Sequence, residues 1–414
     1  MKQHKRLAIT LLGLAAATSA ATAGDEPITA APAPAPSGGC DWCSCLTDKF
    51  GEPLYSNDDA MLIQAVKFFG RLQVQFAAID GEGYDGDDFA DTFDEIRRMR
   101  FGAEVKALKY FKIKANANFE NDSTPSGGDR DIGYDSLDSA LVSFNAGALL
   151  GGGALDSLTI NAGRHKLDLT HEVHESSKKI KTVERSAVAN KVYPGRMTGI
   201  TVDAAKGNVS GRVGIFSTEA SNEFATSTDG LAFYASGTYE LGNGDEIIGD
   251  FLYNDASGSD DNEIRDNVGT ALYEWAIALS YLAERDRWEF LLQGTLGDNG
   301  DLSNSSRSGT FWGFVAMASY DVLADKLEAV ARYSYQGAEE DQGIRANSRY
   351  LRRDHGGNVM GGYGDQHHSI YAGLNYFLCG HNAKLMGGLE LETLETVGGD
   401  VDALTWWLAF RSYF

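Results

Sequence analysis

Apolar and polar residues alternate with a period of two along most of the chain from Val66 onward. In the first segment the apolar positions are Val66, Phe68, Leu72, Val74 and Phe76, and the polar positions are Lys67, Arg71, Gln73 and Gln75. Successive side chains of a strand point to opposite faces, so this pattern predicts β-strands with one apolar and one polar face.

Sixteen such segments follow one another, each bounded by Gly, Asn, Asp or Ser. They span residues 66–78, 96–107, 110–120, 134–145, 157–164, 199–205, 208–217, 230–240, 245–254, 270–282, 286–296, 309–320, 325–336, 367–378, 382–392 and 403–414. Long polar connections alternate with short turns, and the long ones are 79–95, 121–133, 165–198, 218–229, 255–269, 297–308, 337–366 and 393–402. Alternating long and short connections are typical of a transmembrane β-barrel. The prediction is a 16-stranded antiparallel transmembrane barrel.

A soluble β-sandwich is the alternative, because its strands also alternate apolar and polar residues. A sandwich does not require the long and short rhythm of connections, and its last strand need not run to the final residue. Here the last segment ends at Phe414, with Tyr413 and Ser412 before it. A terminal aromatic resembles the signal recognised by the outer-membrane barrel assembly machinery, although the usual companion aromatic is replaced by Ser412.

The N-terminal part of the chain differs from the rest. Basic residues precede an apolar run from Leu7 to Ala17, and small residues follow to Ala23, so residues 1–23 are predicted to be a signal peptide. Residues 24–65 contain a Pro-rich stretch and are predicted to form a short irregular periplasmic leader, with the barrel at 66–414. The rest of the sequence contains no run of 18 apolar residues, so no transmembrane helix is predicted. The net charge of −23 argues against nucleic-acid binding.

If the apolar face meets lipid, the polar face lines a water-filled lumen. The predicted anion-selective lining consists of Arg71, Arg98, Arg100, Lys112, Lys114, Arg212 and Arg411. Most of these lie on the first three strands and on the last, which barrel closure makes neighbours, so they predict one basic wall. The predicted inward acids lie mainly on later strands and are Glu246, Asp250, Glu289, Glu328, Glu390 and Glu392. Lumen charges of this kind select ions by the sign of their charge.

The connection 165–198 is predicted to fold inward and narrow the pore. It carries seven Lys or Arg residues against four acids, a net charge of +3. The basic residues predicted to form the constriction are Lys166, Lys178, Lys179, Lys181, Arg185 and Arg196. By contrast, the connection 79–95 holds eight acids and no base, and it is predicted to be a solvated external loop.

Two motifs could in principle indicate other chemistry, a metal site or disulfide bonds. His171 and His174 are three residues apart, whereas a zinc-protease helix needs four, so neither a metal site nor an enzyme is predicted. The four cysteines, Cys40, Cys43, Cys45 and Cys379, fall in parts expected to face the oxidising periplasm. We expect all four to be paired, with one disulfide joining the leader to the turn at Cys379. No cofactor is predicted.

Four short motifs resemble the phosphate-selective porin O and P family. They are Glu95–Gly102 (EIRRMRFG), Gly163–Lys166 (GRHK), Val183–Ser186 (VERS) and Pro194–Arg196 (PGR). The resemblance implies a homotrimeric outer-membrane porin of a Gram-negative-type cell, with anion preference. We therefore expect a diffusion channel for small hydrophilic solutes, with preference for phosphate or other small anions. The alternative is a non-conducting barrel that acts as an adhesin or envelope anchor.

Overall fold

The structure is a computed structural model. It describes residue 43 and residues 52–120, 132–151, 153–219, 221, 223–225, 230–255, 273–301, 304–346, 349–353 and 357–414. These belong to one compact unit, Asp41–Phe414. The predicted signal peptide, most of the predicted leader, Cys40 and Cys45 lie outside the described residues.

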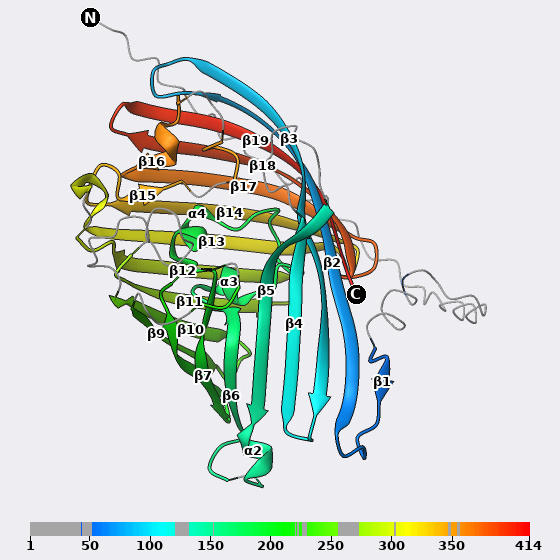
Figure 1. The fold of residues 1–414 in the computed structure, drawn as a ribbon. Helices are drawn as coiled ribbons and strands as arrows, with labels where there is room; N and C mark the ends of the chain where they lie inside the picture. Colours follow the sequence, from blue (N-terminus) through cyan, green and yellow to red (C-terminus); the bar gives the residue numbers. More distant parts are fainter. Residues whose placement is uncertain are drawn as a thin grey trace, which may run out of the picture. The chain divides into compact units, whose positions relative to one another are not determined.

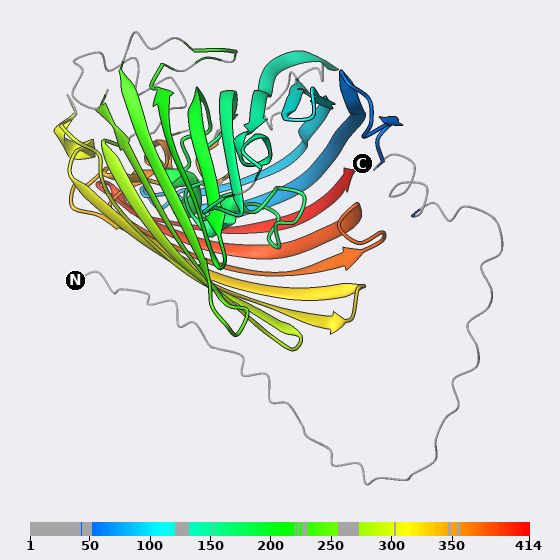
Figure 2. The ribbon, with the colours of Figure 1, turned by 90° about the horizontal axis from the view of Figure 1, so that it is seen from below.

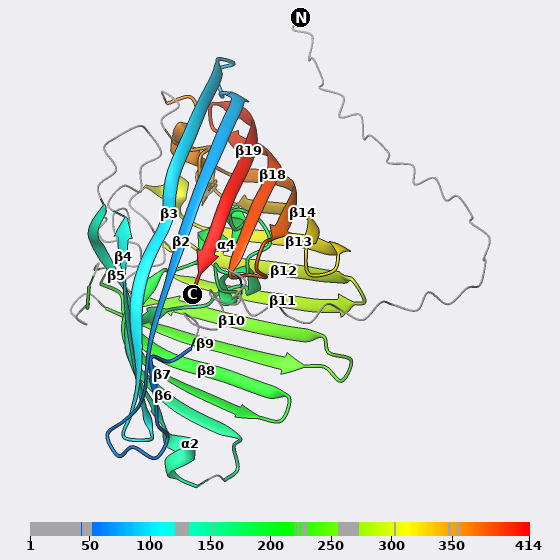
Figure 3. The same ribbon diagram turned by 90° about the vertical axis from the view of Figure 1, so that its right-hand side faces the viewer.

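Sixteen long strands form the wall of a barrel (Figure 1). They are β2 (Ile63–Glu82), β3 (Asp88–Ala107), β4 (Phe111–Glu120), β5 (Ile132–Asn145), β6 (Ser157–Lys166), β7 (Arg196–Lys206), β8 (Val209–Ser217), β9 (Leu231–Glu240), β10 (Glu246–Asn254), β11 (Trp275–Arg285), β12 (Trp288–Asp298), β13 (Thr310–Leu323), β14 (Leu327–Ala338), β17 (Gln366–Phe377), β18 (Ala383–Thr396) and β19 (Gly399–Tyr413). Each strand pairs antiparallel with the next, and β19 closes the ring on β2 with Tyr413 opposite Arg71 (Figure 3). The prediction of a 16-stranded antiparallel barrel is confirmed.

The shorter elements lie in the segments before and between the long strands. They are β1 (Tyr55–Ser56), α2 (Ala146–Leu149), α3 (His171–His174), α4 (Ala187–Val192), η3 (Ser305–Arg307), β15 (Ile344–Arg345), η4 (Met360–Gly362) and β16 (Tyr363–Gly364). None of the helices found among the described residues has the length and apolarity needed to cross a membrane.

Burial along the strands follows the predicted alternation. On β2 the outward side chains Phe68, Leu72 and Phe76 are about two-fifths exposed, while the inward Gln73 and Gln75 are buried. Large apolar side chains are exposed on the outer wall because lipid tails, not water, are their natural surroundings. Backbone polar groups are satisfied within the closed ladder, as the hydrocarbon core requires.

The prediction that 79–95 is a loop was wrong. Strands β2 and β3 have 20 residues each, and only residues 83–87 separate them. The acidic stretch keeps the period of two: Phe93 and Glu95 point inward and are buried, whereas Asp88 and Asp94 are exposed. The high acid content suggested a solvated loop, but strands that project beyond the membrane can carry outward carboxylates in water.

Two long connections fold into the lumen. Residues 167–195, which include α3 and α4, join β6 to β7 and lie within the curve of the wall (Figure 2). We call this segment the constriction loop. Residues 339–365 join β14 to β17, and the described part of this segment packs inside as well; we call it the second loop. The predicted inward-folded connection is confirmed, whereas the inward packing of the second loop was not predicted.

Apolar contacts fix both loops to the wall. Leu167, Leu169 and Val192 of the constriction loop lie in one buried cluster with residues of β7–β14. Val183, near the middle of the same loop, lies in another cluster with Tyr350 and Leu351 of the second loop. Inward apolar residues such as Phe93 and Trp407 complete this second cluster. The lumen is therefore partly filled by packed side chains.

A disulfide joins Cys43 to Cys379 in the turn between β17 and β18, with 5.3 Å between the Cα atoms. It ties the chain that precedes the barrel to the wall at this end. The strand-closing residue Phe414 lies at the same end, where its backbone exchanges hydrogen bonds with Gly70.

Replacing an outward residue by a charged one should destabilise the barrel more, the deeper that residue lies in the membrane. Leu408, on the outer face of β19, is 58% exposed, and Val397, in the turn before β19, is 60% exposed. We expect Leu408→Arg to lower the free energy of unfolding by about 2–4 kcal/mol and Val397→Arg by about 0–1 kcal/mol. Urea titration of the protein folded in lipid bilayers measures both. Equal losses would contradict the assignment of β19 to the lipid.

Candidate functional site

Polar contacts hold the constriction loop against the β10–β14 side of the wall. Asp250 of β10 accepts a hydrogen bond from the backbone N–H of Thr170 at 3.0 Å and pairs with His174 Nε2 at 2.8 Å. Further along, Lys181 Nζ lies 2.6 Å from Glu328 Oε1 and 3.1 Å from Glu289 Oε2. Inward carboxylates of the wall therefore bind the loop.

Arg332 of β14 is the central contact of this side. Its guanidinium donates to Thr182 Oγ1 at 3.0 Å and to the carbonyl oxygen of Glu184 at 2.9 Å. It also pairs with Glu172 Oε1 at 3.2 Å and with Glu390 Oε1 of β18 at 2.9 Å. Because Arg332 is 2% exposed, these contacts are shielded from water. One arginine thus joins two strands to three positions of the loop.

Lys384 and Arg411 perform the same task on β18 and β19. Lys384 Nζ donates to the carbonyl oxygen of Ile180 at 2.7 Å, and Arg411 donates to that of Val183 at 2.6 Å. Both side chains are fully buried. Arg411, predicted to line the pore, instead lies beneath the loop. The sequence could not indicate this, since an inward basic residue looks the same whether a loop or water covers it.

The other side of the constriction loop faces an open cavity of about 490 Å³ beside β2–β8. Nine Lys or Arg residues are among the described residues that line it: Arg71, Arg97, Arg98, Arg100, Lys114, Lys166, Arg185, Arg196 and Arg212. Asp138 is the single carboxylate among those same lining residues. Neutral polar groups such as Ser176, Ser177 and Asn116 also line it. The cavity is therefore strongly positive.

Two β-bulges place extra charges in this cavity. Gln73 of β2 pairs with Arg98 of β3, but the next residue, Val74, pairs with Ile96, so Arg97 is the extra residue. Between β4 and β5 the register likewise skips Asp138. A bulge re-aims a side chain, and here adjacent residues both turn inward. Strict alternation missed Arg97 and Asp138, although each forms a polar pair between apolar neighbours, which is the signal that could have revealed them.

Asp138 holds two of the cavity arginines in place. Its carboxylate lies 2.9 Å from Arg100 Nη1 of β3 and 2.9 Å from Arg196 Nη2 at the end of the constriction loop. Asn116 Nδ2 donates a third hydrogen bond at 2.7 Å. Asp138 therefore orients two guanidinium groups that would otherwise repel each other.

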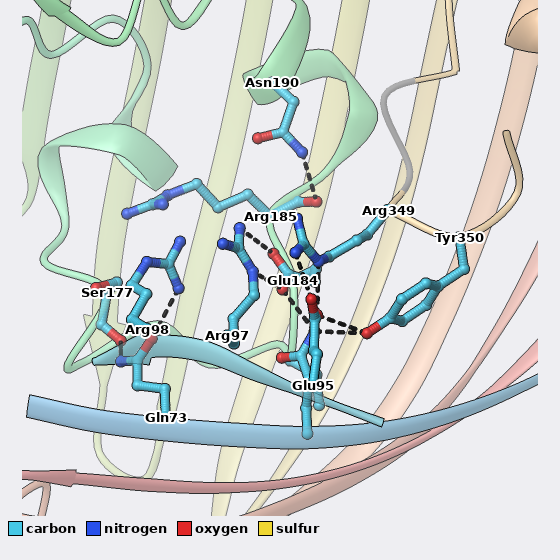
Figure 4. A network of polar contacts seen from close by, with 12 residues as sticks. Gln73, Glu95, Arg97, Arg98, Ser177, Glu184, Arg185, Asn190, Arg349 and Tyr350 are labelled. Carbon is cyan, nitrogen blue, oxygen red and sulfur yellow. Dashed lines mark hydrogen bonds and ion pairs between the residues drawn. The ribbon is translucent and has the colours of Figure 1, made fainter. Parts of the chain in front are cut away.

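Glu184 of the constriction loop does the same for Arg97 (Figure 4). Arg97 Nε donates to Glu184 Oε1 at 2.6 Å, and Gln75 Nε2 donates to the same oxygen at 2.9 Å. Burial alone would raise the pKa of Glu184, but Arg97 keeps this pKa well below its usual range. Beside it, Arg98 donates to the neutral Gln73 Oε1 at 2.7 Å, and Arg71 donates to the hydroxyl of Ser177.

The remaining predicted residues fall into two groups, those that line the cavity and those that do not. Arg212, Lys166 and Lys114 belong to the first group. Arg212 lines the cavity and pairs with Asp203 at 2.8 Å, and Lys166 pairs with Asp168 at 2.6 Å. Lys178, whose Nζ lies 4.1 Å from the ring centre of Tyr413, and the exposed Lys179 are outside the set that lines the cavity, as is Lys181. Lys112 is exposed opposite Lys106, also away from the cavity.

The histidines of the constriction loop lie on one short helical turn, α3, rather than in irregular chain. Across the parts of the chain with described structure, no group of three or more His, Cys, Asp or Glu residues could hold a metal ion. The chemistry of the site rests on its guanidinium and ammonium groups.

Comparisons with known proteins agree with this architecture. Residues 66–278 match the sequence pattern of the family described as phosphate-selective porin O and P. No curated protein sequence matches the chain. Similar solved structures include the outer-membrane channel DcaP of Acinetobacter baumannii, at 11% identity over 87% of this chain and 100% of that chain, with a TM-score of 0.54.

Two further structures share the fold. Outer-membrane OmpT of Vibrio cholerae is 11% identical over 88% of this chain and 100% of its own, with a TM-score of 0.53. An anion-selective porin from Comamonas acidovorans is 11% identical over 84% of this chain and 99% of its own, with a TM-score of 0.51. At this level of identity the likeness concerns the barrel itself.

Removing Arg332 should loosen the constriction loop. We expect Arg332→Met to weaken loop docking by about 3 kcal/mol, because it leaves buried carboxylates without their cation. The variant should show larger single-channel conductance and more current noise in planar bilayers. Arg287→Met is the matched control, since Arg287 stacks on Tyr320 at 4.8 Å in a turn at the end of the wall. Identical conductance in both variants would show that Arg332 does not hold the constriction.

Proposed function

The chain belongs to the phosphate-selective porin O and P family, and from this premise we propose that it is a water-filled channel that prefers small anions, phosphate among them. A porin fold of the outer membrane carries solutes across by diffusion rather than by catalysis. The observation that supports anion preference is the cavity in which nine Lys or Arg residues accompany one carboxylate among the described lining.

The charge of this cavity bears directly on which ions enter. A narrow, wet passage with low-dielectric walls focuses the field of its lining charges and raises the local concentration of counter-ions. Guanidinium groups are well suited to oxyanions because they present several donors in one plane. A passage lined by arginines therefore favours phosphate-like anions over cations of the same size.

The acids on the later strands do not oppose this preference. Asp250, Glu328, Glu390 and Glu392 are each 5% exposed or less, and they lie against the constriction loop or within the wall. Glu390 pairs with Arg332 and Glu328 pairs with Lys181, while Asp250 is hydrogen-bonded to His174. The negative net charge of the chain is carried largely elsewhere, including the outward carboxylates of β2 and β3.

Export and assembly complete the proposal. Residues 1–23 would direct the chain across the inner membrane, and residues 24–65 would form a leader on the periplasmic side of the barrel (66–414). The barrel assembly machinery would then insert it into the outer membrane. In the membrane we propose a homotrimer, with lipid around the outer walls.

Ion selectivity in planar bilayers tests the proposal. In a salt gradient the zero-current potential should have the sign of anion preference, and Arg71→Gln/Arg98→Gln should reduce that preference. Both residues line the cavity, and they donate hydrogen bonds to the neutral partners Ser177 and Gln73 rather than to a carboxylate. The control, Arg285→Gln/Arg287→Gln, removes two charges at the end of β11 and in the turn that follows it, outside the residues that line the cavity.

The possible results separate the candidate functions. Stepwise anion-selective openings with loss of selectivity only in the cavity variant support the channel. Silence of a correctly folded barrel would favour an adhesin or envelope anchor. Equal effects of both double variants would contradict the role of the cavity.

Selectivity should also depend on pH. Burial, followed by the nearby charge of Arg71, lowers the pKa of Lys178 to about 8. Lys178 does not line the cavity itself, but it follows Ser177, which does, so its charge adds to the field there. A lysine is charged below its pKa and neutral above it, so we expect anion preference to fall as pH rises through about 8. The step in the zero-current potential should disappear in Lys178→Met and persist in Lys179→Met, its exposed neighbour. Persistence of the same step in Lys178→Met would assign it to another group.

A further inference from the structure

A row of charged side chains, with two carboxylates between two arginines, runs from the second loop to the wall of the cavity (Figure 4). Arg349 of the second loop donates to Glu95 of β3, with Nε 2.6 Å from Oε1. Gln75 Nε2 donates to Glu95 at 2.6 Å and also to Glu184 at 2.9 Å. Glu184 in turn pairs with Arg97, which lines the cavity. The two carboxylates are thus neighbours bridged by one amide.

Glu95 is enclosed rather than solvated. It is 5% exposed, and its Oε1 atom also accepts a hydrogen bond from the Tyr350 hydroxyl at 2.6 Å. A carboxylate at such a position retains its charge only with cationic partners nearby. Arg349 is the cation that the second loop contributes here.

The second loop does not depend on this ion pair for its position. Tyr350 is fully buried, its ring stacks on that of Phe93 at 4.7 Å between centres, and Trp407 lies 5.1 Å away. Leu351 and Val359 are buried in the same cluster. Arg349 is therefore carried by a segment that apolar packing anchors.

From these contacts we infer that Arg349 is a positioning residue for ion selectivity, which acts on the passage through Glu95 and Arg97 although it is not among the residues that line the cavity. The inference rests on the proposed function, since it explains how the selectivity of that cavity is set. By matching the charge of Glu95, Arg349 leaves Arg97 paired with one carboxylate only. The second loop thus takes part in selectivity as well as in filling the lumen.

The electrostatic reason is the short distance between the two carboxylates. Without Arg349, Glu95 would lose its closest cation, and Arg97, already paired with Glu184, would be drawn toward both carboxylates and away from the cavity. The net charge beside the passage would also become more negative by one unit. Without Glu95, in contrast, Arg349 would add one positive charge near Glu184.

Opposite shifts in two single variants test this account. In a salt gradient, Arg349→Gln should lower the ratio of anion to cation permeability by about threefold, the effect of one charge acting through a wet protein interior. Glu95→Gln should raise the ratio. The double variant Arg349→Gln/Glu95→Gln should return it to the wild-type value, and Arg349→Lys should retain most of it.

Arg345→Gln is the matched control, because Arg345 belongs to the same loop but donates to the carbonyl oxygen of Gly361 at 3.1 Å and stacks on Tyr363. Like Arg349→Gln, it removes one positive charge from the second loop, but it should leave the ratio of anion to cation permeability nearly unchanged. Equal effects of Arg345→Gln and Arg349→Gln would overturn the inference, as would shifts of the same sign in Arg349→Gln and Glu95→Gln, which would indicate simple release of the loop.

The wild-type protein separates this inference from the proposed function. If the wild type prefers anions but the single variants do not shift in opposite directions, the positioning role of Arg349 is wrong and the anion channel stands. If the wild type shows no anion preference and the opposite shifts remain, the proposed preference is wrong and the positioning role stands.

Discussion

Closure of the sheet is the constraint on which the rest of this structure depends. A strand in the hydrocarbon core needs a hydrogen-bonding partner on both sides, and the pairing of β19 with β2 supplies the last one. Once the ring is closed, every strand presents one face to lipid and one to the lumen. The inward side chains are polar because the outward ones must be apolar. A polar lumen then has to be filled, either by water or by chain that can bind those side chains.

The two inner loops divide the lumen unequally. On the β10–β19 side, inward charged residues such as Asp250, Arg332 and Lys384 bind the constriction loop. On the β2–β8 side the loop leaves a cavity, and the inward charges there remain available to solutes. The same kind of residue thus has two roles, and the position of the loop decides which one it takes. This is why an inward acid on a late strand says little about the selectivity of the passage.

The same distinction explains how far sequence reasoning could reach. The strands and their faces were predictable because a period of two is a local property that lipid enforces at each residue. The inward fold of the constriction loop was expected from its place between the fifth and sixth strands and from its charge. Which inward residues it covers was not predictable, because Arg411 and Arg98 differ only in what lies over them in three dimensions. The bulges at Arg97 and Asp138 break the period that carried the prediction.

The second loop was beyond reach for a similar reason. Its polar, highly charged sequence resembles that of an external loop, and only the match of Tyr350 and Leu351 to inward apolar residues of distant strands brings it inside. Such a match depends on pairs of residues more than 250 positions apart, as between Tyr350 and Glu95 at a sequence separation of 255. No local sequence pattern indicates such a contact.

Carboxylates among the arginines of the cavity have a physical purpose. Several guanidinium groups that face one cavity repel one another, and without partners they would turn away or bind an anion too firmly to release it. Asp138 and Glu184 reduce that repulsion while holding Arg100, Arg196 and Arg97 in fixed directions. Conduction needs binding that is favourable enough for entry and weak enough for exit. A positive cavity in which some cations are paired with carboxylates fits both conditions, and the bulges add Arg97 and Asp138 to its surface.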